Sequence, residues 1–248
     1  MNIIKSTKDK VFTKSLTGRI VSKALSVPAL GRTAFQLSIF IKRLSLLTGS
    51  WSQRAVEYPW VLTQIKSIKP GSLILDVGCA ESLLSHELTA KSLRVVGLDI
   101  RDYPFRSKKI VFIKRNVIDT KLPAKTFDAI IVVSTIEHTG LNAYGQLTLD
   151  DDGDIKAMKE LYRILKPQGI IIITTPYIGS NPLRVYPFER YYNRQRLEKL
   201  VEGFQTIKEE YFYPQRQGSR LHWAKLNREK IDEQNFREAG LACLILKK

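Results

Sequence analysis

The chain has 248 residues, of which 44% are hydrophobic and 9% aromatic. These values suit a globular core and exclude a wholly disordered protein. Lys and Arg total 40 against 24 Asp and Glu, so the formal net charge is +16, which points to nucleic acid, an anionic membrane surface or an acidic substrate as partner. Two cysteines are too few for a disulfide framework and indicate a reduced, cytoplasmic setting. No apolar run reaches the ~18 residues of a membrane span.

Half of the excess charge lies in residues 1–50, which contain nine Lys or Arg and a single acid. Residues 1–18 are polar and basic without periodicity, so we predict a flexible arm there. Apolar residues at helical spacing among basic ones predict an amphipathic helix over about 33–47. This helix either covers an apolar patch of the main domain or lies on a membrane or a partner. We therefore divide the chain into a basic N-terminal extension, 1–50, and a main domain, 51–248.

In the main domain, short apolar runs alternate with helical periodicity. The apolar runs predict strands at 72–77, 94–98, 110–114, 127–134 and 170–175, with two more in the tail near 206–213 and 241–247. Apolar residues three and four apart predict helices at 54–66, 82–91, 154–165, 193–202 and 228–238. We expect Lys166–Gly169 to form the turn that ends the helix at 154–165, because proline cannot continue a helix. The alternation favours an α/β fold with a doubly wound, mostly parallel sheet.

The segment Leu75–Ser82 joins the first predicted strand to the next helix. Its small residues, Gly78 and Ala80, let backbone N–H groups approach a ligand at the carboxyl end of the sheet. Asp99 ends the following strand, 21 positions after Gly78, where an acid can accept hydrogen bonds from ribose hydroxyls. The dinucleotide fingerprint lacks its second and third glycines, and Glu81 is negative where a pyrophosphate would lie. Electrostatics therefore favours a sulfonium cofactor over NAD. The alternative to a cofactor site is a purely structural turn between strand and helix, with the Asp as a helix cap.

Taken together, the motifs resemble those of class I SAM-dependent methyltransferases. Leu75–Ser82 is similar to their first motif and Asp99 to their second. Phe127–His138 resembles the fourth motif in the form with an acidic-His pair, and Glu160–Gly169 resembles the signature before the fifth strand. The resemblance covers about residues 70–180. It implies a seven-stranded Rossmann-like sheet with a reversed last strand, and S-adenosyl-L-methionine as cofactor.

The resemblance also assigns residues to the cofactor. It places Asp76, Gly78 and Ala80 around the methionine part, Asp99 at the ribose, Asn116 and Val117 at the adenine, and Ser134 beside the cofactor at the end of the fourth strand. Two positions depart from the family pattern, because Ala80 replaces a glycine and Asn116 replaces an acid. An Asn can still accept the adenine amine through its carbonyl oxygen.

Catalysis is assigned to the pair that follows the fourth strand. Methyl transfer needs a close, aligned acceptor, and a hydroxyl or amine acceptor benefits from a base near its proton. We predict His138 as that base and Glu137 as its orienter or as an alternative base, while a structural pair that fixes the loop is the competing interpretation. No carboxylate follows closely after Thr139, so we predict no metal site. The acidic cluster Asp150–Asp154 is interpreted as a solvated loop that caps the next helix.

Several aromatic and basic residues are candidates for the acceptor pocket or for ordinary packing. They are Tyr144, Tyr177, Arg184, Tyr186 and Arg190, together with Tyr58 and Trp60 on the helix before the first strand.

The predicted function is SAM-dependent methyl transfer to a small-molecule or glycan-like acceptor, with oxygen as the favoured atom. An RNA methyltransferase that uses the basic surface is less favoured, because no Asn/Asp-Pro-Pro-aromatic motif follows the strand at 127–134. A third possibility is a non-catalytic SAM-fold protein. In each case residues 1–47 are a candidate for peripheral contact with an anionic membrane or a partner, so we expect a cytoplasmic protein or one peripheral at the membrane.

Overall fold

A computed structural model describes residues 53–105, 107–141, 144, 149–185, 188–217, 220–233 and 239–248. The arm, the helix at 33–47 and the rest of the N-terminal extension that the sequence predicts therefore lie outside the described residues. None of the helices in the described part is long and apolar enough to cross a membrane.

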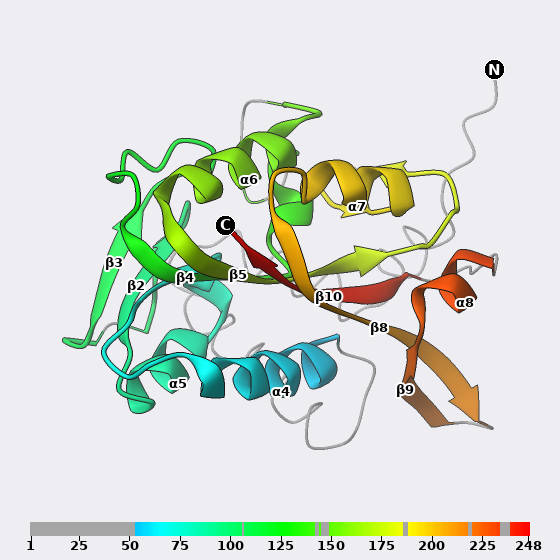
Figure 1. The fold of residues 1–248 in the computed structure, drawn as a ribbon, viewed down its shortest axis with the longest axis horizontal. Coiled ribbons are helices and arrows are strands. Elements are labelled where there is room, and N and C mark those ends of the chain that lie inside the picture. Colours follow the sequence, from blue (N-terminus) through cyan, green and yellow to red (C-terminus); the bar gives the residue numbers. More distant parts are fainter. Residues whose placement is uncertain are drawn as a thin grey trace, which may run out of the picture. The chain divides into compact units, whose positions relative to one another are not determined.

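The described residues are built around one eight-stranded sheet with strand order β3–β2–β1–β4–β5–β10–β8–β9 (Figure 1). Its strands are β1 (Leu73–Val77), β2 (Arg94–Asp99), β3 (Ile110–Lys114), β4 (Phe127–Val133), β5 (Leu165–Tyr177), β8 (Gln205–Gln217), β9 (Arg220–Leu226) and β10 (Gly240–Lys247). The strands from β3 to β5 are parallel, and β10 runs antiparallel to both β5 and β8. The fold is α/β and doubly wound with a reversed strand near its end, as the sequence predicts.

The predicted count of seven strands is wrong, because β9 adds an eighth. β9 pairs antiparallel with β8 and forms the edge of the sheet. Its sequence, Arg220–Leu226, mixes basic, polar and apolar residues and has no uninterrupted apolar run. An edge strand needs a backbone partner on one side only and is not buried on both faces. The hydrophobic pattern that reveals a central strand is therefore missing.

Helices cover both faces of the sheet (Figure 1). One face carries α4 (Arg54–Gln64), which continues into the short helix η1 (Ile65–Ser67), and α5 (Leu84–Ala90). The other face carries α6 (Gly153–Ile164) and α7 (Arg194–Leu200), while α8 (Arg228–Glu233) follows β9. These bounds agree with the predicted helices to within a few residues over the described part.

The core consists of two apolar clusters, one on each face of the sheet. In β4, Ile130 and Val132 belong to the cluster under α6, whereas Ala129 and Ile131 belong to the cluster under α4 and α5. Alternate side chains of the strand are thus buried on opposite faces, which explains why the whole run is apolar. Each fully buried aliphatic side chain of this kind contributes about 1.5–3 kcal/mol.

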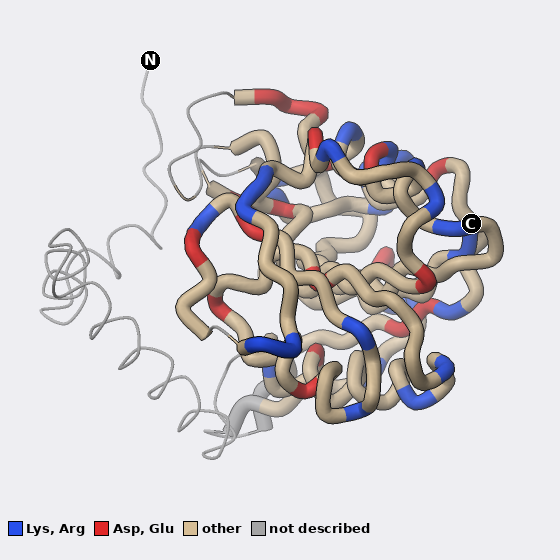
Figure 2. Tube along the Cα trace, turned by 90° about the vertical axis from the view of Figure 1, so that its left-hand side faces the viewer, with Lys and Arg blue, Asp and Glu red and all other residues tan. Residues whose placement is uncertain are grey.

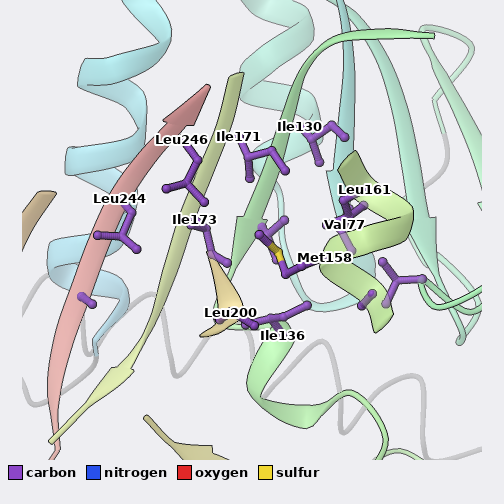
Figure 3. Close-up of a cluster of buried hydrophobic side chains, with 14 of the residues drawn as sticks. Val77, Ile130, Ile136, Met158, Leu161, Ile171, Ile173, Leu200, Leu244 and Leu246 are labelled. Carbon is purple, nitrogen blue, oxygen red and sulfur yellow. The ribbon is translucent and has the colours of Figure 1, made fainter. Parts of the chain in front are cut away.

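On the α6 face the sheet and the helix are packed directly together. Met158 and Leu161 of α6 lie beside Val77 of β1, and Leu200 of α7 joins the same cluster (Figure 3). The three- and four-residue spacing of these helical positions is what the sequence predicts for a helix with one apolar face.

The predicted turn at Lys166–Gly169 is wrong, because these residues belong to the start of β5. Gln168 has a left-handed φ of 65°, and the pairing of β4 with β5 shifts register at this place. The last residue of the chain supports the segment, since the Lys248 N–H donates to the Gly169 carbonyl at 3.1 Å and the Gln168 N–H donates to the Lys248 carbonyl at 3.2 Å. This contact between distant parts of the chain keeps the segment in the strand despite the local signal for a turn.

Charged residues of both signs are interspersed over the described part (Figure 2). Many of them are paired, for example Lys114 with Asp102 at 3.0 Å and Lys166 with Asp128 at 2.7 Å. Acids therefore balance part of the positive charge of the described residues locally.

Candidate functional site

The candidate site is an open cleft at the carboxyl ends of β1 to β4. The lining residues come from the segments that follow these strands and from the start of α4; they are Arg54, Val77, Gly78, Glu81, Leu98, Asp99, Ile100, Arg101, Arg115, Asn116, Val117, Ser134, Thr135, His138, Thr139 and Tyr144. We call the part formed after β1, β2 and β3 the cofactor side, and the part formed by His138, Thr139 and Tyr144 the acceptor side.

Gly78 makes the turn from β1 into the short helix η2 (Cys79–Glu81). It has a φ of 78°, and its N–H donates to the Leu98 carbonyl of β2 at 2.8 Å. A Cβ at this position would lie 2.2 Å from the Thr135 hydroxyl oxygen of the next loop. Both the backbone conformation and the close approach of Thr135 therefore require glycine.

Asp99, at the end of β2, is buried and held mainly by backbone groups. Its Oδ2 accepts the Ala80 N–H at 2.9 Å and its Oδ1 accepts the Arg101 N–H at 2.9 Å. The Arg101 side chain adds longer contacts, from Nε to Oδ1 at 3.2 Å and from Nη2 to Oδ2 at 3.3 Å. The carboxylate is thus fixed in position, and its weaker contacts are those made by a side chain that can move.

Glu81 does not act as an isolated negative charge. Its Oε1 accepts a hydrogen bond from Arg101 Nη1 at 2.6 Å, and the same guanidinium lies 3.9 Å from the centre of the Tyr144 ring. The argument that Glu81 would repel a pyrophosphate is therefore weaker than the sequence suggests, because Arg101 compensates the charge. Arg101 and Tyr144 instead connect the cofactor side to the acceptor side.

Asn116 and Val117 follow β3 and line the cleft, where the resemblance places the adenine. The Asn116 Oδ1 accepts the Ile118 N–H at 3.0 Å and so braces its own loop. A carbonyl oxygen has two lone pairs, so this contact leaves the side chain capable of a second one.

Two of the predicted cofactor residues, Asp76 and Ala80, are absent from the lining of the cleft. Asp76 is buried and accepts the Ser85 hydroxyl of α5 at 2.6 Å. Burial raises the pKa of Asp76 to about 7, although the Ser85 hydrogen bond and the positive charge of Arg54 oppose the shift. The structure thus places Asp76 in the support of the turn, and Ala80 contributes its backbone N–H to Asp99.

A buried network around Glu57 supports the end of β4. The carboxylate accepts hydrogen bonds from the hydroxyls of Ser134 and Thr174, the latter at 2.7 Å, and from Arg54 Nη1 at 3.2 Å. Ser134 has a φ of 41°, a strained conformation for a residue other than glycine that needs such support. Sequence reasoning missed this network; the available signal was an acidic residue on the buried face of a helix, three residues before Trp60.

His138 lies in the short helix η3 (Ile136–His138) and lines the acceptor side. Its Nδ1 is 2.5 Å from the Phe188 carbonyl oxygen, and its ring meets the Tyr144 ring edge-to-face at 5.4 Å. Burial lowers the pKa of His138, which outweighs the opposing effect of the Phe188 hydrogen bond. Since a carbonyl can only accept, Nδ1 carries the proton in the neutral ring and Nε2 carries the basic lone pair.

Glu137 has a different environment from its neighbour. Its side chain is 2% exposed and lies outside the lining of the cleft, and its Oε2 has no hydrogen-bond partner among the residues that the structure describes. Burial raises the pKa of Glu137 to about 8. The group that the structure shows orienting the His138 imidazole is therefore the Phe188 carbonyl, and the role predicted for Glu137 stays a prediction.

Arg190 fastens the loop that carries the acceptor side. It is 1% exposed, and its guanidinium donates to the carbonyls of Thr139 at 2.5 Å, Asp150 at 3.0 Å and Asp151 at 3.2 Å. The Asp150 N–H also donates to the Gly140 carbonyl at 2.8 Å, which closes the neck of the loop. Arg190 belongs to β7 (Arg190–Tyr191), which pairs with β6 (Arg184–Val185), and it does not line the cleft.

The interpretation of Asp150–Asp154 as a solvated loop is wrong for Asp154. This residue is 0% exposed and accepts hydrogen bonds from the Tyr192 hydroxyl at 3.0 Å and from Arg196 Nη2 at 2.5 Å. It therefore anchors the start of α6 to the segment that follows β7. The partners lie about forty residues downstream, so the local sequence carries no sign of them.

Other candidates are divided between the cleft and the core. Tyr144 lines the cleft, whereas Tyr177 and Trp60 are buried elsewhere, with the Tyr177 hydroxyl donating to Asp232 at 2.6 Å and Trp60 Nε1 donating to Glu210 at 3.0 Å. Tyr58 and Arg184 are not among the lining residues, and Tyr186 lies outside the described residues. Within the described part, no three His, Cys, Asp or Glu residues are grouped so that they could hold a metal ion.

Comparison with solved structures identifies the class of fold. The crystal structure of 1,6-didemethyltoxoflavin-N1-methyltransferase from Burkholderia thailandensis covers 100% of this chain and 93% of its own, with a TM-score of 0.56 and 14% identity. A SAM-dependent methyltransferase from Archaeoglobus fulgidus covers 84% of this chain and 99% of its own, with a TM-score of 0.57 and 20% identity. The fold is therefore that of the class I SAM-dependent methyltransferases.

Residues 89–248 match the family model described as "Caenorhabditis protein of unknown function, DUF268", and the chain belongs to this family. Among curated proteins it is similar to the sterol 24-C-methyltransferase erg6 of Aspergillus fumigatus, with 27% identity over 147 residues. That match covers 52% of this chain and 36% of the relative, so the chain spans little more than a third of the relative's length.

Proposed function

We propose that this protein is a SAM-dependent methyltransferase that acts on a small-molecule or glycan-like acceptor, preferentially at an oxygen atom. The observation that carries the proposal is the cofactor side of the cleft, where Gly78, Asp99 and Asn116 meet at the ends of three adjacent parallel strands. The similarity to methyltransferases in fold and, over about half the chain, in sequence supports the same activity.

The residues of the cofactor side fit the proposed cofactor. Asp99 can accept ribose hydroxyls if these replace the two longer contacts from the Arg101 side chain, while the bonds from two backbone N–H groups keep the carboxylate in place. The absence of a side chain at Gly78 leaves backbone at the centre of the cleft, which allows a ligand to approach closely. Asn116 and Val117 offer a polar and an apolar contact for the adenine.

Bound S-adenosylmethionine supplies a methyl group on a sulfonium, which is a good leaving group for an in-line displacement. The chain then has to hold the acceptor close and to remove a proton from it. His138 is suited to the second task, since its lowered pKa keeps the imidazole neutral near pH 7 and the Phe188 carbonyl fixes which nitrogen is basic. A neutral base beside the cleft favours a hydroxyl acceptor, whose proton must leave during transfer.

The test is calorimetric binding of S-adenosylhomocysteine, the product form of the cofactor. The wild-type protein should bind it, and Asp99→Asn should bind about 10-fold or more weakly, because hydrogen bonds to a charged acceptor are worth about 1.5–3 kcal/mol. Asp102→Asn is the matched control: it lies three residues further on, is exposed, and pairs with Lys114.

Absence of binding by the wild-type protein at millimolar S-adenosylhomocysteine would refute the proposal. Binding that is equally strong in the wild type and Asp99→Asn would show that Asp99 does not hold the ribose. The residue that holds the ribose would then have to be sought elsewhere in the cleft.

A further inference from the structure

Arg54 is a cationic residue of the cleft that the sequence did not reveal. It is the first residue of α4 and lines the cleft together with Gly78, Ser134 and His138. Its Nη1 donates to the Val133 carbonyl at the end of β4 at 3.2 Å, which brings the guanidinium to the carboxyl edge of the sheet. Helix α4 thus places a positive charge between the cofactor side and the acceptor side.

The position of Arg54 is fixed by a buried carboxylate. Glu57 is 0% exposed and contacts Arg54 Nη1 at 3.2 Å, while the hydroxyls of Ser134 and Thr174 hold the opposite oxygen of the same carboxylate. Helix α4, β4 and β5 therefore all contribute to holding one guanidinium. Because the Arg54 side chain is already held in place, a ligand that contacts it would cost less conformational entropy.

The charges around Arg54 explain why a cation is needed there. Burial lowers the pKa of Arg54, but the negative charges of Glu57 and, further away, Glu137 and Glu81 outweigh burial and raise it, so the side chain remains charged. Without this cation, the region would repel any negatively charged group of a ligand.

The other two arginines of the cleft are placed for different tasks. Arg101 bonds Asp99 and Glu81 on the cofactor side. Arg115 directly precedes Asn116 and donates its backbone N–H to the Asp99 carbonyl, so it belongs to the loop after β3. Arg54 is the cleft arginine that contacts the end of β4, and it lines the cleft together with Gly78, where the methionine part of the cofactor is expected from the resemblance.

We propose that Arg54 binds the carboxylate at the amino-acid end of S-adenosylmethionine, and that Glu57 is the residue that positions it. The proposal rests on the proposed function, because it assumes that the cleft holds this cofactor. A guanidinium matches a carboxylate in charge and in geometry, since it can donate two parallel N–H bonds.

The experiment compares two ligands that differ at that end. S-adenosylhomocysteine contains the amino-acid carboxylate, whereas 5′-methylthioadenosine keeps the adenine, the ribose and the sulfur but lacks the amino-acid group. Arg54→Gln should weaken S-adenosylhomocysteine binding by about 10- to 100-fold and leave 5′-methylthioadenosine binding within about 2-fold. Arg54→Lys should show a smaller loss, because it keeps the charge and loses the paired geometry.

Two further variants serve as controls. Arg54→Gln leaves Glu57 as an unpaired buried carboxylate, so the double variant Arg54→Gln/Glu57→Gln is measured beside it. The ratio of the two affinities is taken within each variant, so a general loss of stability cancels. Arg115→Gln is the matched control, an arginine of the same cleft whose loss should not change that ratio.

An equal loss for both ligands, or an unchanged affinity for S-adenosylhomocysteine in Arg54→Gln, would overturn the assignment while the proposed function stands. Failure of the wild-type protein to bind S-adenosylhomocysteine would instead refute the proposed function and this assignment with it. A selective loss with S-adenosylhomocysteine, retained in the double variant and absent from Arg115→Gln, would support it.

Discussion

The cofactor side and the acceptor side of the cleft are held in place by different kinds of contact. On the cofactor side, backbone N–H groups make the bonds between neighbouring segments: the Gly78 N–H donates to the Leu98 carbonyl, the Ala80 N–H to the Asp99 side chain and the Arg115 N–H to the Asp99 carbonyl. All of these residues lie within about forty positions.

The acceptor side depends on side chains and on segments far apart in the sequence. His138 contacts the Phe188 carbonyl fifty residues away, and Arg190 holds Thr139 from a distance of fifty-one residues. A site whose frame is the parallel sheet itself is a property of the fold, whereas a site assembled from loops can vary without disturbing the fold. We therefore infer that the sheet determines which cofactor the protein binds and that the loops determine which acceptor it binds. Variants that affect one side alone test this division.

The largest expected effect on the acceptor side comes from His138→Gln. Loss of the base should lower methyl transfer by about 100-fold, the lower end of what general base catalysis contributes. The affinity for S-adenosylhomocysteine should stay within about 2-fold, since the cofactor-side contacts are backbone-held. The measurement is the transfer of labelled methyl to an acceptor on which the wild-type protein is active, with calorimetry on the same preparation.

His86→Gln serves as the control for this variant. His86 lies on α5, where its Nε2 contacts the Phe105 carbonyl at 2.9 Å, and it does not line the cleft. Equal rates for His138→Gln and wild type would leave His138 with a structural role only. A parallel loss of rate and of S-adenosylhomocysteine affinity would show that the two sides are not independent.

A second variant, Arg190→Gln, should loosen the acceptor side without affecting the chemistry directly. Removing the guanidinium takes one donor from each of the carbonyls of Thr139, Asp150 and Asp151, so the neck of the loop should open more often. The Asp150 carbonyl keeps the Gly153 N–H and the Asp151 carbonyl keeps Arg196 Nη2. We expect amide exchange at Asp150, whose N–H bonds Gly140, to accelerate about 10-fold or more. Hydrogen exchange read by mass spectrometry, with β1 and β2 as internal reference, measures this.

The control is Arg194→Gln at the start of α7, which removes the ion pairs of Arg194 with Glu198 and Asp232 and no contact of the loop neck. Unchanged exchange at Asp150 in Arg190→Gln would show that the Gly140–Asp150 bond closes the loop alone. A rise in exchange throughout β1 and β2 would mean that Arg190 stabilises the whole sheet.

The same contrast explains how much could be predicted from the sequence. The central strands, the Gly78 turn and the position of Asp99 follow from local signals, namely buried apolar runs and small residues at their ends. Edge strand β9 and the continuation of β5 through Lys166–Gly169 were missed, because pairing with β8 and with the chain end determines them. Long-range backbone contacts of this kind leave little trace in a hydrophobic pattern.

Prediction of the site was limited in a similar way. Six of the nine predicted site residues line the cleft; the other three are Asp76, Ala80 and Glu137. The sequence does not single out Arg54, since nothing near it shows that α4 begins at the cleft. Nothing in the local sequence indicates that Asp154 is buried, because Arg196 and Tyr192 approach it from another segment.

The smallest expected effect, on stability, concerns Glu137. Its pKa is raised by burial from the ordinary value of 4.5 to about 8, so the folded protein retains a proton that the unfolded chain releases over this range. The contribution of Glu137 to stability is therefore full below about pH 4.5 and is lost as the pH rises towards 8. Gln has no proton to lose, so Glu137→Gln should match the wild type at pH 5 and unfold about 2–4 °C higher at pH 8.

Thermal unfolding at a series of pH values measures the effect, with Glu87→Gln on α5 as the control variant. A variant that is destabilised most strongly at pH 8 would show that Glu137 is ionised and paired in the folded protein. That outcome would support the predicted role of Glu137 as the carboxylate that orients His138. It would also weaken the division between the cofactor side and the acceptor side, since the acceptor side would then share the charge network of Arg54.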